Sequence, residues 1–384
     1  MSDIDIISNP FHDNGYRAKM NSDECRRFHK SLPKYSQTPL INLDEFSKQL
    51  NLKSIQIKDE SKRFGLNAFK SLGASYAMAK IIVSNVNNDQ SDLEFESVMQ
   101  KSDAIKKMTF ATATDGNHGR AVAWCAESFG CKAIVFLPKD TSRHRVDAIE
   151  SHGAKAFVTD LNYDETVEYA AKMSDENDWI LIQDTSWAGY EDIPRDIMVG
   201  YQTIIHELEN DDFIWPTHVV MQAGVGSFAA SIFDAFSNID RPRPKFIVVE
   251  PTGAACYFQS IKIGDGNPHS LDKLDTLMAG LCCGTPSILA WDIIKETADF
   301  FAICDDVVAL DSMARLAQMR KPDQAIVSGE SGAVTMGFIE KICMEKEYSE
   351  YLDLIGLNES SNVFFISTEG DTNPDLYDRI VNDQ

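Results

Sequence analysis

Apolar runs of strand length alternate with segments of helical period from Met108 onward, and this alternation constrains the fold more than any other feature. Two of the helical segments end at a glycine, Gly130 and Gly153, as left-handed C-caps prefer. We expect strands over residues 108–112, 133–137, 156–159 and 179–183, and helices over 117–129, 143–152 and 164–177. Stacked βα units over a parallel sheet produce such a pattern, so the chain is predicted to be an α/β protein.

A second series of the same kind begins near Thr217. It has expected strands over 218–222, 245–250 and 363–367, and an expected helix over 227–236. Residues 195–209 have helical periodicity, and the polar break at 210–212 follows them, which places a domain boundary near residue 205. The expected division is a small α/β domain over 76–204 and a large domain over 1–75 and 205–384. Residues 85–101 are polar with little periodicity and predict an exposed or poorly ordered loop.

Charge and hydropathy exclude two classes of partner. The chain carries 59 acidic and 36 basic residues, a formal charge of −23, so counterion release cannot drive binding to nucleic acid. No apolar run approaches the roughly 18 to 20 residues that a membrane helix needs. Residues 1–15 are mostly polar and lack the apolar core of a signal peptide. We therefore expect a cytoplasmic protein that binds neither membranes nor nucleic acid.

The cysteines and histidines give no metal-binding pattern. The eight cysteines form no C-x-x-C pair and are interpreted mainly as free thiols, although their spacing is also compatible with a disulfide. The eight histidines include no H-E-x-x-H arrangement. The sequence therefore predicts no metal centre.

Lys70 is the first candidate for chemistry, because it precedes a run of small residues in Phe69-Lys70-Ser71-Leu72-Gly73-Ala74. A lysine forms a Schiff base with an aldehyde only when its amine is held in place and can lose its proton, and partial burial at a helix start helps with both. The alternative is a surface lysine on an amphipathic helix.

A glycine loop follows the expected strand 218–222 and precedes the expected helix. Successive backbone N–H groups and the helix N-terminus there can hold a phosphate. The loop also matches the G-x-G-x-x-A dinucleotide fingerprint, with Glu250 as the acidic residue at the end of the next strand. By itself it fits a dinucleotide site, a cofactor phosphate cup or a structural turn. The candidate ligands are Gly224, Val225, Gly226 and Ser227.

Taken with Thr114-Asp115-Gly116-Asn117-His118-Gly119, the Lys70 motif and the glycine loop resemble the motifs of fold type II pyridoxal-phosphate enzymes, the tryptophan synthase β-like family. The resemblance implies a two-domain fold with parallel-rich sheets. It also implies that Lys70 carries the Schiff base, that Asn117 donates to the phenolic oxygen of the cofactor, and that residues 224–227 cup its phosphate. A simple N-cap is the alternative for Asn117, and His118 is expected to be a packing or hydrogen-bonding neighbour.

The pyridine nitrogen of such a cofactor also needs a partner, which sets the strength of the ring as an electron sink. In this fold type a hydroxyl or thiol residue at the end of a late strand is often the partner of the pyridine nitrogen. Ser367 and Thr368 occupy the matching place, and Thr368 is favoured. A helix cap after the strand is an equally good interpretation.

Asp115 indicates which members of this family the chain resembles, because serine and threonine dehydratases usually have serine or alanine immediately before the Gly-Asn-His motif. With Asp-Gly-Asn-His-Gly-Arg the chain resembles the diaminopropionate ammonia-lyases, from about Phe11 to the C-terminus. This implies breakdown of 2,3-diaminopropionate to pyruvate and two ammonia molecules by a homodimer. Asp184, just past an expected strand end, is implied as a second acidic residue near the substrate amine, with a turn or cap aspartate as its alternative. Glu330 is a weaker candidate that contacts the cofactor side or stabilises a loop.

The implied mechanism uses Lys70 as the base for the L isomer and Asp115 for the D isomer, on opposite faces of Cα. Three rival functions stay open. One is a serine or threonine dehydratase of the same fold, against which Asp115 argues. The others are a dinucleotide-dependent oxidoreductase, supported by the glycine loop and Glu250 alone, and a non-catalytic cofactor-binding regulator.

Overall fold

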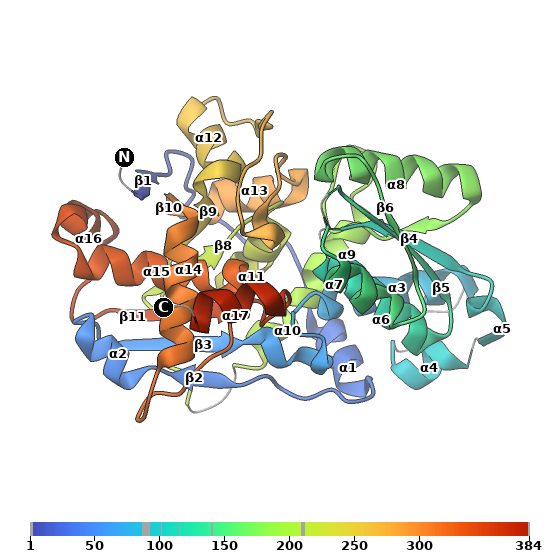
Figure 1. The fold of residues 1–384 in the computed structure, drawn as a ribbon, viewed down its shortest axis with the longest axis horizontal. Coiled ribbons are helices and arrows are strands. Elements are labelled where there is room, and N and C mark those ends of the chain that lie inside the picture. Colours follow the sequence, from blue (N-terminus) through green and yellow to red (C-terminus); the bar gives the residue numbers. More distant parts are fainter. Residues whose placement is uncertain are drawn as a thin grey trace. The chain divides into compact units, whose positions relative to one another are not determined.

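The computed structural model of the protein describes residues 3–86, 93–100, 102–114, 116–139, 141–208 and 212–382. The chain forms two compact units (Figure 1). The first comprises Met1–Lys19, Thr38–Lys62 and Glu207–Gln384, and the second comprises Met20–Gln37 and Arg63–His206. The α/β class with parallel-rich sheets, predicted from the sequence, is confirmed.

The first unit is built on a seven-stranded sheet in the described part of the chain, with the order β1-β10-β9-β8-β11-β3-β2. The inner strands run parallel, and the edge strands β1 and β2 pair antiparallel. The strands are β1 (Ile4–Ser8), β2 (Leu40–Asn42), β3 (Ser54–Asp59), β8 (His218–Gln222), β9 (Lys245–Pro251), β10 (Phe300–Cys304) and β11 (Asn362–Ser367). Every residue of β8 is buried, as expected for a strand inside a parallel sheet that helices cover on both faces.

Helices surround this sheet. They are α2 (Asp44–Gln49), α11 (Ser227–Ser237), α12 (Cys256–Ile263), α13 (Ile288–Thr297), α14 (Asp306–Gln318), α15 (Glu330–Met344), α16 (Ser349–Ile355) and α17 (Pro374–Asn382), with short 3-10 turns at Thr252–Ala254, Ala279–Leu281 and Lys346–Tyr348. Helix α15 packs against β8 and β11, and its Phe338 joins Val220, Ile247 and Phe365 in one buried core. A further 3-10 segment, Glu60–Gly65, spans the boundary between the units in the sequence.

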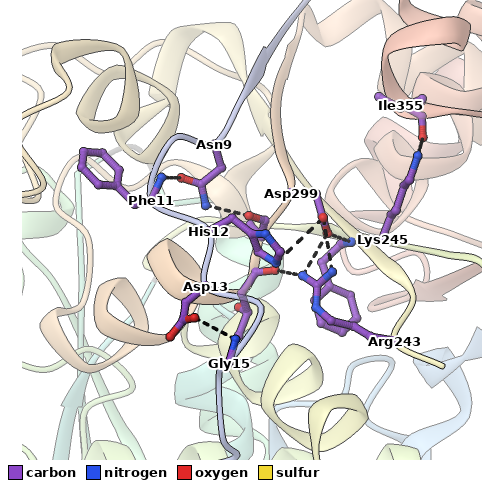
Figure 2. Close-up of polar contacts among 12 residues, drawn as sticks. Asn9, Phe11, His12, Asp13, Gly15, Arg243, Lys245, Asp299 and Ile355 are labelled. Carbon is purple, nitrogen blue, oxygen red and sulfur yellow. Dashed lines mark hydrogen bonds and ion pairs between the residues drawn. The ribbon is translucent and has the colours of Figure 1, made fainter. Parts of the chain in front are cut away.

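Within the first unit, the segment after β1 lies against the end of α13 and contacts Asp299, which follows that helix (Figure 2). The Asn9 amide donates to the carbonyls of Lys295 and Ala298 at 2.8 and 2.6 Å. Arg243 donates to both carboxylate oxygens of Asp299 at 3.2 and 2.9 Å. The N-terminal segment thus satisfies carbonyl groups at the C-terminus of α13, which have no partner within the helix.

The second unit contains a parallel sheet of four strands in the order β6-β5-β4-β7, counted over the residues that the structure describes. The strands are β4 (Thr109–Ala113), β5 (Lys132–Leu137), β6 (Lys155–Val158) and β7 (Ile180–Leu181). The helices are α1 (Asp23–Ser31), α3 (Ser71–Val86), α4 (Phe95–Met99), α5 (Ser102–Ile105), α6 (Asn117–Phe129), α7 (Arg143–Glu150), α8 (Tyr163–Asn177), α9 (Asp192–Tyr201) and α10 (Thr203–His206).

Local sequence signals predicted the bounds of some elements well and of others less well. Helix α6 begins at Asn117 and ends at Phe129, where Gly130 takes the left-handed conformation with φ of 78°. Strand β7, in contrast, is shorter than the expected strand 179–183. The reason is that the N–H of Ala113 binds the side-chain oxygen of Gln183 at 3.0 Å, so a side chain replaces the backbone ladder there.

Two other expectations differ from the structure. The helical segment 195–209 forms two helices, α9 and α10, as far as it is described. The expected loop 85–101 contains helix α4, which is held because the N–H of Phe95 binds Ser31 Oγ at 2.8 Å and its ring lies 5.9 Å from that of Phe129. Residues 87–92 and 101 of that segment, and residues 210–211 of the polar break, lie outside the described residues.

The domain division expected from the sequence stays a prediction, and the compact units differ from it on the N-terminal side. Residues 20–37 and 63–75 group with the second unit, whereas the later boundary at 206/207 is close to the expected one near 205. Within the described residues, no helix is long and apolar enough to cross a membrane. All eight cysteines are described, and all are free thiols.

Candidate active site

Lys70 occupies the turn immediately before α3 in the second unit, and its side chain is 19% exposed. The small residues after it let α3 approach α9 closely. A Cβ on Gly73 would lie 2.6 Å from Cε1 of Tyr201, and one on Gly200 would lie 2.6 Å from the carbonyl oxygen of Leu72. Larger residues at these two positions would push the helices apart. Tight packing behind the turn therefore sets the place of Lys70.

Asp184, in the loop after β7, forms an ion pair with Lys70. The Nζ atom of Lys70 lies 2.5 Å from Oδ2 of Asp184, whose side chain is only 4% exposed. Burial alone raises the pKa of Asp184, but the charges of Lys70 and His118 and the hydrogen bond from Lys70 outweigh it and lower the pKa to about 2. Asp184 is therefore a carboxylate at neutral pH.

His118 joins this pair from α6. Its Nδ1 lies 3.8 Å from Oδ2 of Asp184, and its Nε2 lies 2.8 Å from the carbonyl oxygen of Ile182. A carbonyl only accepts, so the Nε2 atom carries the hydrogen. His118 thus connects the start of α6 with the loop that presents Asp184.

The loop before α6 is organised by Thr114. Its hydroxyl oxygen accepts the N–H groups of Gly116 at 2.9 Å and Gly119 at 3.1 Å. Gly116 is the N-cap of α6, so Asn117 is the first residue inside the helix, and its side chain is half-buried. The simple N-cap interpretation of Asn117 does not match this geometry. Asp115 lies outside the described residues.

In the first unit, the glycine loop connects β8 with the N-terminus of α11. Gly226 is the N-cap, with φ of 92°, and a Cβ there would lie 2.0 Å from the hydroxyl oxygen of Tyr257. The carbonyl of Val225 accepts hydrogen bonds from the Tyr257 hydroxyl and the Ser287 N–H, both at 2.9 Å. Only glycine fits this turn, and the first N–H groups of α11 have no partner within the helix. This arrangement can hold a phosphate.

Thr368 follows β11 and is reached from β8 by Gln222. The Nε2 atom of Gln222 donates to the Thr368 hydroxyl oxygen at 2.8 Å, so Thr368 retains its own hydroxyl hydrogen for another acceptor. Ser367 differs, because its hydroxyl donates to Ser328 Oγ at 2.8 Å. Since β8 and β11 are parallel neighbours, their carboxyl ends place the glycine loop and Thr368 at the same edge of the sheet.

Two acidic candidates lie at helix N-termini: Glu250 binds the first turn of α12, and Glu330 begins α15. The carboxyl oxygens of Glu250 accept the N–H groups of Tyr257 at 2.8 Å and Phe258 at 2.7 Å, and burial raises the pKa of Glu250 to about 8. A carboxyl group held in this way at the start of α12 does not suit a ribose hydroxyl, which argues against the dinucleotide interpretation. Glu330 is the first residue of α15, and the partial positive charge of a helix N-terminus stabilises a negative charge at this position.

Sequence reasoning missed the residues that support these sites. Thr114, Gln222 and Tyr257 each bind a loop that carries a candidate ligand, and none was singled out. Gln222 ends an expected strand and Thr114 lies two residues after one, both next to glycine-containing turns, and this position was the available signal. Tyr257 gave no local signal, because its contact with Val225 spans 32 positions.

Each unit contains residues that fit a part of pyridoxal phosphate. In the first unit, the turn at Gly226 excludes any side chain and leaves backbone N–H groups for a phosphate. In the second unit, the hydroxyl of Ser71, next to Lys70, is buried and has no hydrogen-bond partner within the described protein. Buried polar groups are nearly always hydrogen-bonded, so this hydroxyl fits a polar group supplied by a ligand.

Comparisons with known proteins agree with this chemistry. The family described as "Pyridoxal-phosphate dependent enzyme" matches residues 32–354. The chain is 45% identical to the diaminopropionate ammonia-lyase of Salmonella typhimurium, over 93% of this chain and 91% of that protein. It is 40% identical to the diaminopropionate ammonia-lyase of Escherichia coli K12, over 98% of this chain and 96% of that protein.

Solved structures give the same picture. The crystal structure of the Escherichia coli diaminopropionate ammonia lyase, in complex with an aminoacrylate–PLP azomethine reaction intermediate, has a TM-score of 0.89 and 39% identity, and covers 98% of this chain and 96% of that one. The threonine deaminase of Solanum lycopersicum, with a TM-score of 0.72 and 20% identity, shares the fold. This protein therefore belongs to the pyridoxal-phosphate-dependent enzymes and, within them, to the diaminopropionate ammonia-lyases.

Proposed function

We propose that the protein cleaves 2,3-diaminopropionate, with one water, to pyruvate and two ammonia molecules by pyridoxal-phosphate-dependent α,β-elimination. The observation that carries the proposal is the contact of Lys70 with Asp184, a buried carboxylate that stays ionised, in a chain of this family. When bound, the cofactor supplies an electron sink for the charge left at Cα after proton removal.

The residues of the first unit would hold the cofactor. The N–H groups of Gly224, Val225, Gly226 and Ser227 would bind its phosphate at the N-terminus of α11. The Thr368 hydroxyl would donate to its pyridine nitrogen, because Gln222 already donates to the Thr368 oxygen. A neutral hydroxyl donor leaves that nitrogen unprotonated.

The residues of the second unit would bind the aldehyde and move protons. Lys70 would bond to the aldehyde carbon and, once released by the substrate amine, would take the Cα proton of the L isomer. Asn117 would donate to the phenolic oxygen. Asp115 would take the Cα proton of the D isomer, and Asp184 would attract the substrate's ammonium group. A primary amine leaves only when protonated, so a carboxylate near it favours a β-amine over a β-hydroxyl.

Product analysis on the purified holoenzyme tests this function. Diaminopropionate should give two ammonia per pyruvate, and serine and threonine should have much lower kcat/KM. Borohydride reduction should fix the cofactor covalently on Lys70, and Lys70→Ala should abolish both the adduct and turnover. A higher kcat/KM for serine or threonine would replace the lyase with a dehydratase, and an adduct on another lysine would remove Lys70 from its role.

We also infer a cytoplasmic homodimer that takes a free amino acid as substrate. Eight free thiols suit a reducing compartment, and the family resemblance supports the dimer. Light scattering on the purified protein tests the dimer. A mass near twice the 42.9 kDa of the chain is expected, and a mass of 42.9 kDa would contradict the dimer.

A further inference from the structure

A buried histidine from α1 lies behind the lysine turn of the second unit. The side chain of His29 is fully buried. Its Nε2 atom lies 2.9 Å from the carbonyl oxygen of Leu72, two residues after Lys70, and its Nδ1 atom lies 2.7 Å from the hydroxyl oxygen of Thr203. Three segments far apart in the sequence therefore meet at one imidazole.

The partners of His29 determine its tautomer. A carbonyl oxygen only accepts, so Nε2 carries the hydrogen and donates to Leu72. In the neutral ring Nδ1 is then an acceptor, and the Thr203 hydroxyl donates to it. Neutral imidazole satisfies both contacts at once, with a donor and an acceptor on opposite edges of a rigid ring.

The carbonyl of Leu72 has little freedom. A Cβ on Gly200 would approach it to 2.6 Å, so α9 closes one side while His29 binds it from another. The turn that carries Lys70 is continuous with it, because the N–H of Leu72 binds the carbonyl of Phe69 at 3.0 Å and the N–H of Ala74 binds that of Lys70 at 3.2 Å. A displacement of Leu72 is therefore transmitted to Lys70.

We propose that His29 is a positioning residue for the chemistry of Lys70. Held by Thr203, it fixes the Leu72 carbonyl, and through the turn it fixes the place from which the Lys70 amine meets Asp184. The proposal rests on the proposed role of Lys70 as the cofactor-binding lysine. His29 belongs to residues 20–37, which group with the second unit.

Three variants separate positioning from simple packing. His29→Phe keeps a ring but neither hydrogen bond, His29→Gln retains a donor and an acceptor, and Thr203→Val removes only the hydroxyl that holds Nδ1. His152→Gln is the matched control, because His152 also lies in the second unit but binds Glu127 at its surface. Far-UV circular dichroism and the melting temperature establish whether each variant is folded.

Two readouts report on Lys70 itself. The first is the rate at which the apoprotein gains a borohydride-fixed adduct on Lys70 after addition of pyridoxal phosphate. The second is the pH dependence of amine labelling of Lys70 in the apoprotein, followed by peptide mass spectrometry. Steady-state kinetics with diaminopropionate then separate kcat from KM.

We expect His29→Phe to form the Lys70 adduct about tenfold to a hundredfold more slowly and to lose kcat by a similar factor, with a smaller change in KM. His29→Gln should recover part of this loss. The adduct rate and kcat of Thr203→Val should lie between those of His29→Phe and the wild type, and His152→Gln should behave as the wild type. The labelling profile of Lys70 should change in the same order.

Folded His29→Phe protein with wild-type adduct kinetics and labelling would overturn the proposal. If His29→Phe does not fold, the other two variants decide, and wild-type kinetics in both would overturn it as well. Failure of the proposed function looks different, because the wild-type protein itself would then carry no adduct on Lys70 or would have a higher kcat/KM for serine or threonine than for diaminopropionate.

Discussion

Lys70 and Asp184 are 114 positions apart in the sequence, yet the lysine amine donates a 2.5 Å hydrogen bond to a carboxylate that is almost wholly buried. A buried carboxylate without a partner would have a raised pKa, so the low pKa of Asp184 shows that this contact dominates its environment. The pair keeps the amine beside a fixed negative charge.

Asp184→Asn should destabilise the apoprotein by about 2 kcal/mol at neutral pH, because the pKa of Asp184 is lowered from 3.8 to about 2. A lowered pKa contributes stability above the unfolded-state value, and this contribution is lost as the pH falls through the folded-state value. The difference in unfolding free energy between wild type and variant should thus be constant above about pH 4 and shrink toward pH 2. Urea unfolding across this range measures it, and a pH-independent difference would contradict the assignment.

Gly226→Ala should raise the dissociation constant for pyridoxal phosphate by at least about tenfold, because the added Cβ would lie 2.0 Å from the Tyr257 hydroxyl in the turn that holds the phosphate. Gly264→Ala is the matched control, since Gly264 also has a positive φ, 77°, but its Cβ would meet nothing closer than 3.9 Å. Cofactor retention on dialysis separates them. Equal retention in both variants would identify the loop as a structural turn.

Thr368→Val should shift the visible absorption of the bound cofactor and lower turnover by about tenfold, the effect of one lost hydrogen bond. Ser367→Ala provides the comparison, because the Ser367 hydroxyl already donates to Ser328. It should lower the melting temperature and leave the spectrum unchanged. If the spectrum responds to Ser367→Ala and not to Thr368→Val, the neighbouring residue is the partner of the ring.

Asp115→Asn should reduce turnover of D-diaminopropionate by a factor of about a hundred or more, since an amide of the same shape cannot accept the Cα proton. Turnover of the L isomer should fall much less, because Lys70 serves that face. Initial rates with each isomer test the assignment. Equal losses would show that Asp115 acts in binding or on the leaving amine.

Glu250→Gln should flatten the pH dependence of stability. The pKa of Glu250 is raised by burial from 4.5 to about 8, so its contribution is fully present below pH 4.5 and is lost as the pH rises through 8. Between these values the wild type should lose up to about 1.4 kcal/mol per pH unit relative to the variant. Unfolding experiments from pH 4 to 9 measure this slope, and parallel curves would contradict a protonated Glu250.

The sequence alone determined the elements whose signals are local. Helix α6 follows from its helical period and from the glycine at its end, and β8 follows from one apolar run before a glycine turn. The motifs around Lys70 and Asn117 and the loop at residues 224–227 were visible for the same reason, because the residues of each lie next to one another along the chain.

Only the tertiary structure decided which of these motifs are supported, and by what. That Asp184 meets Lys70, and that Gln222 binds Thr368 across 146 positions, depends on the order of strands in each sheet, which no local pattern encodes. The shortening of β7 has the same cause, since the side chain of Gln183 took the place of a backbone partner for the N–H of Ala113. Residues 20–37 carry no motif of their own, yet they group with the second unit, where both hydrogen-bond partners of the buried His29 lie.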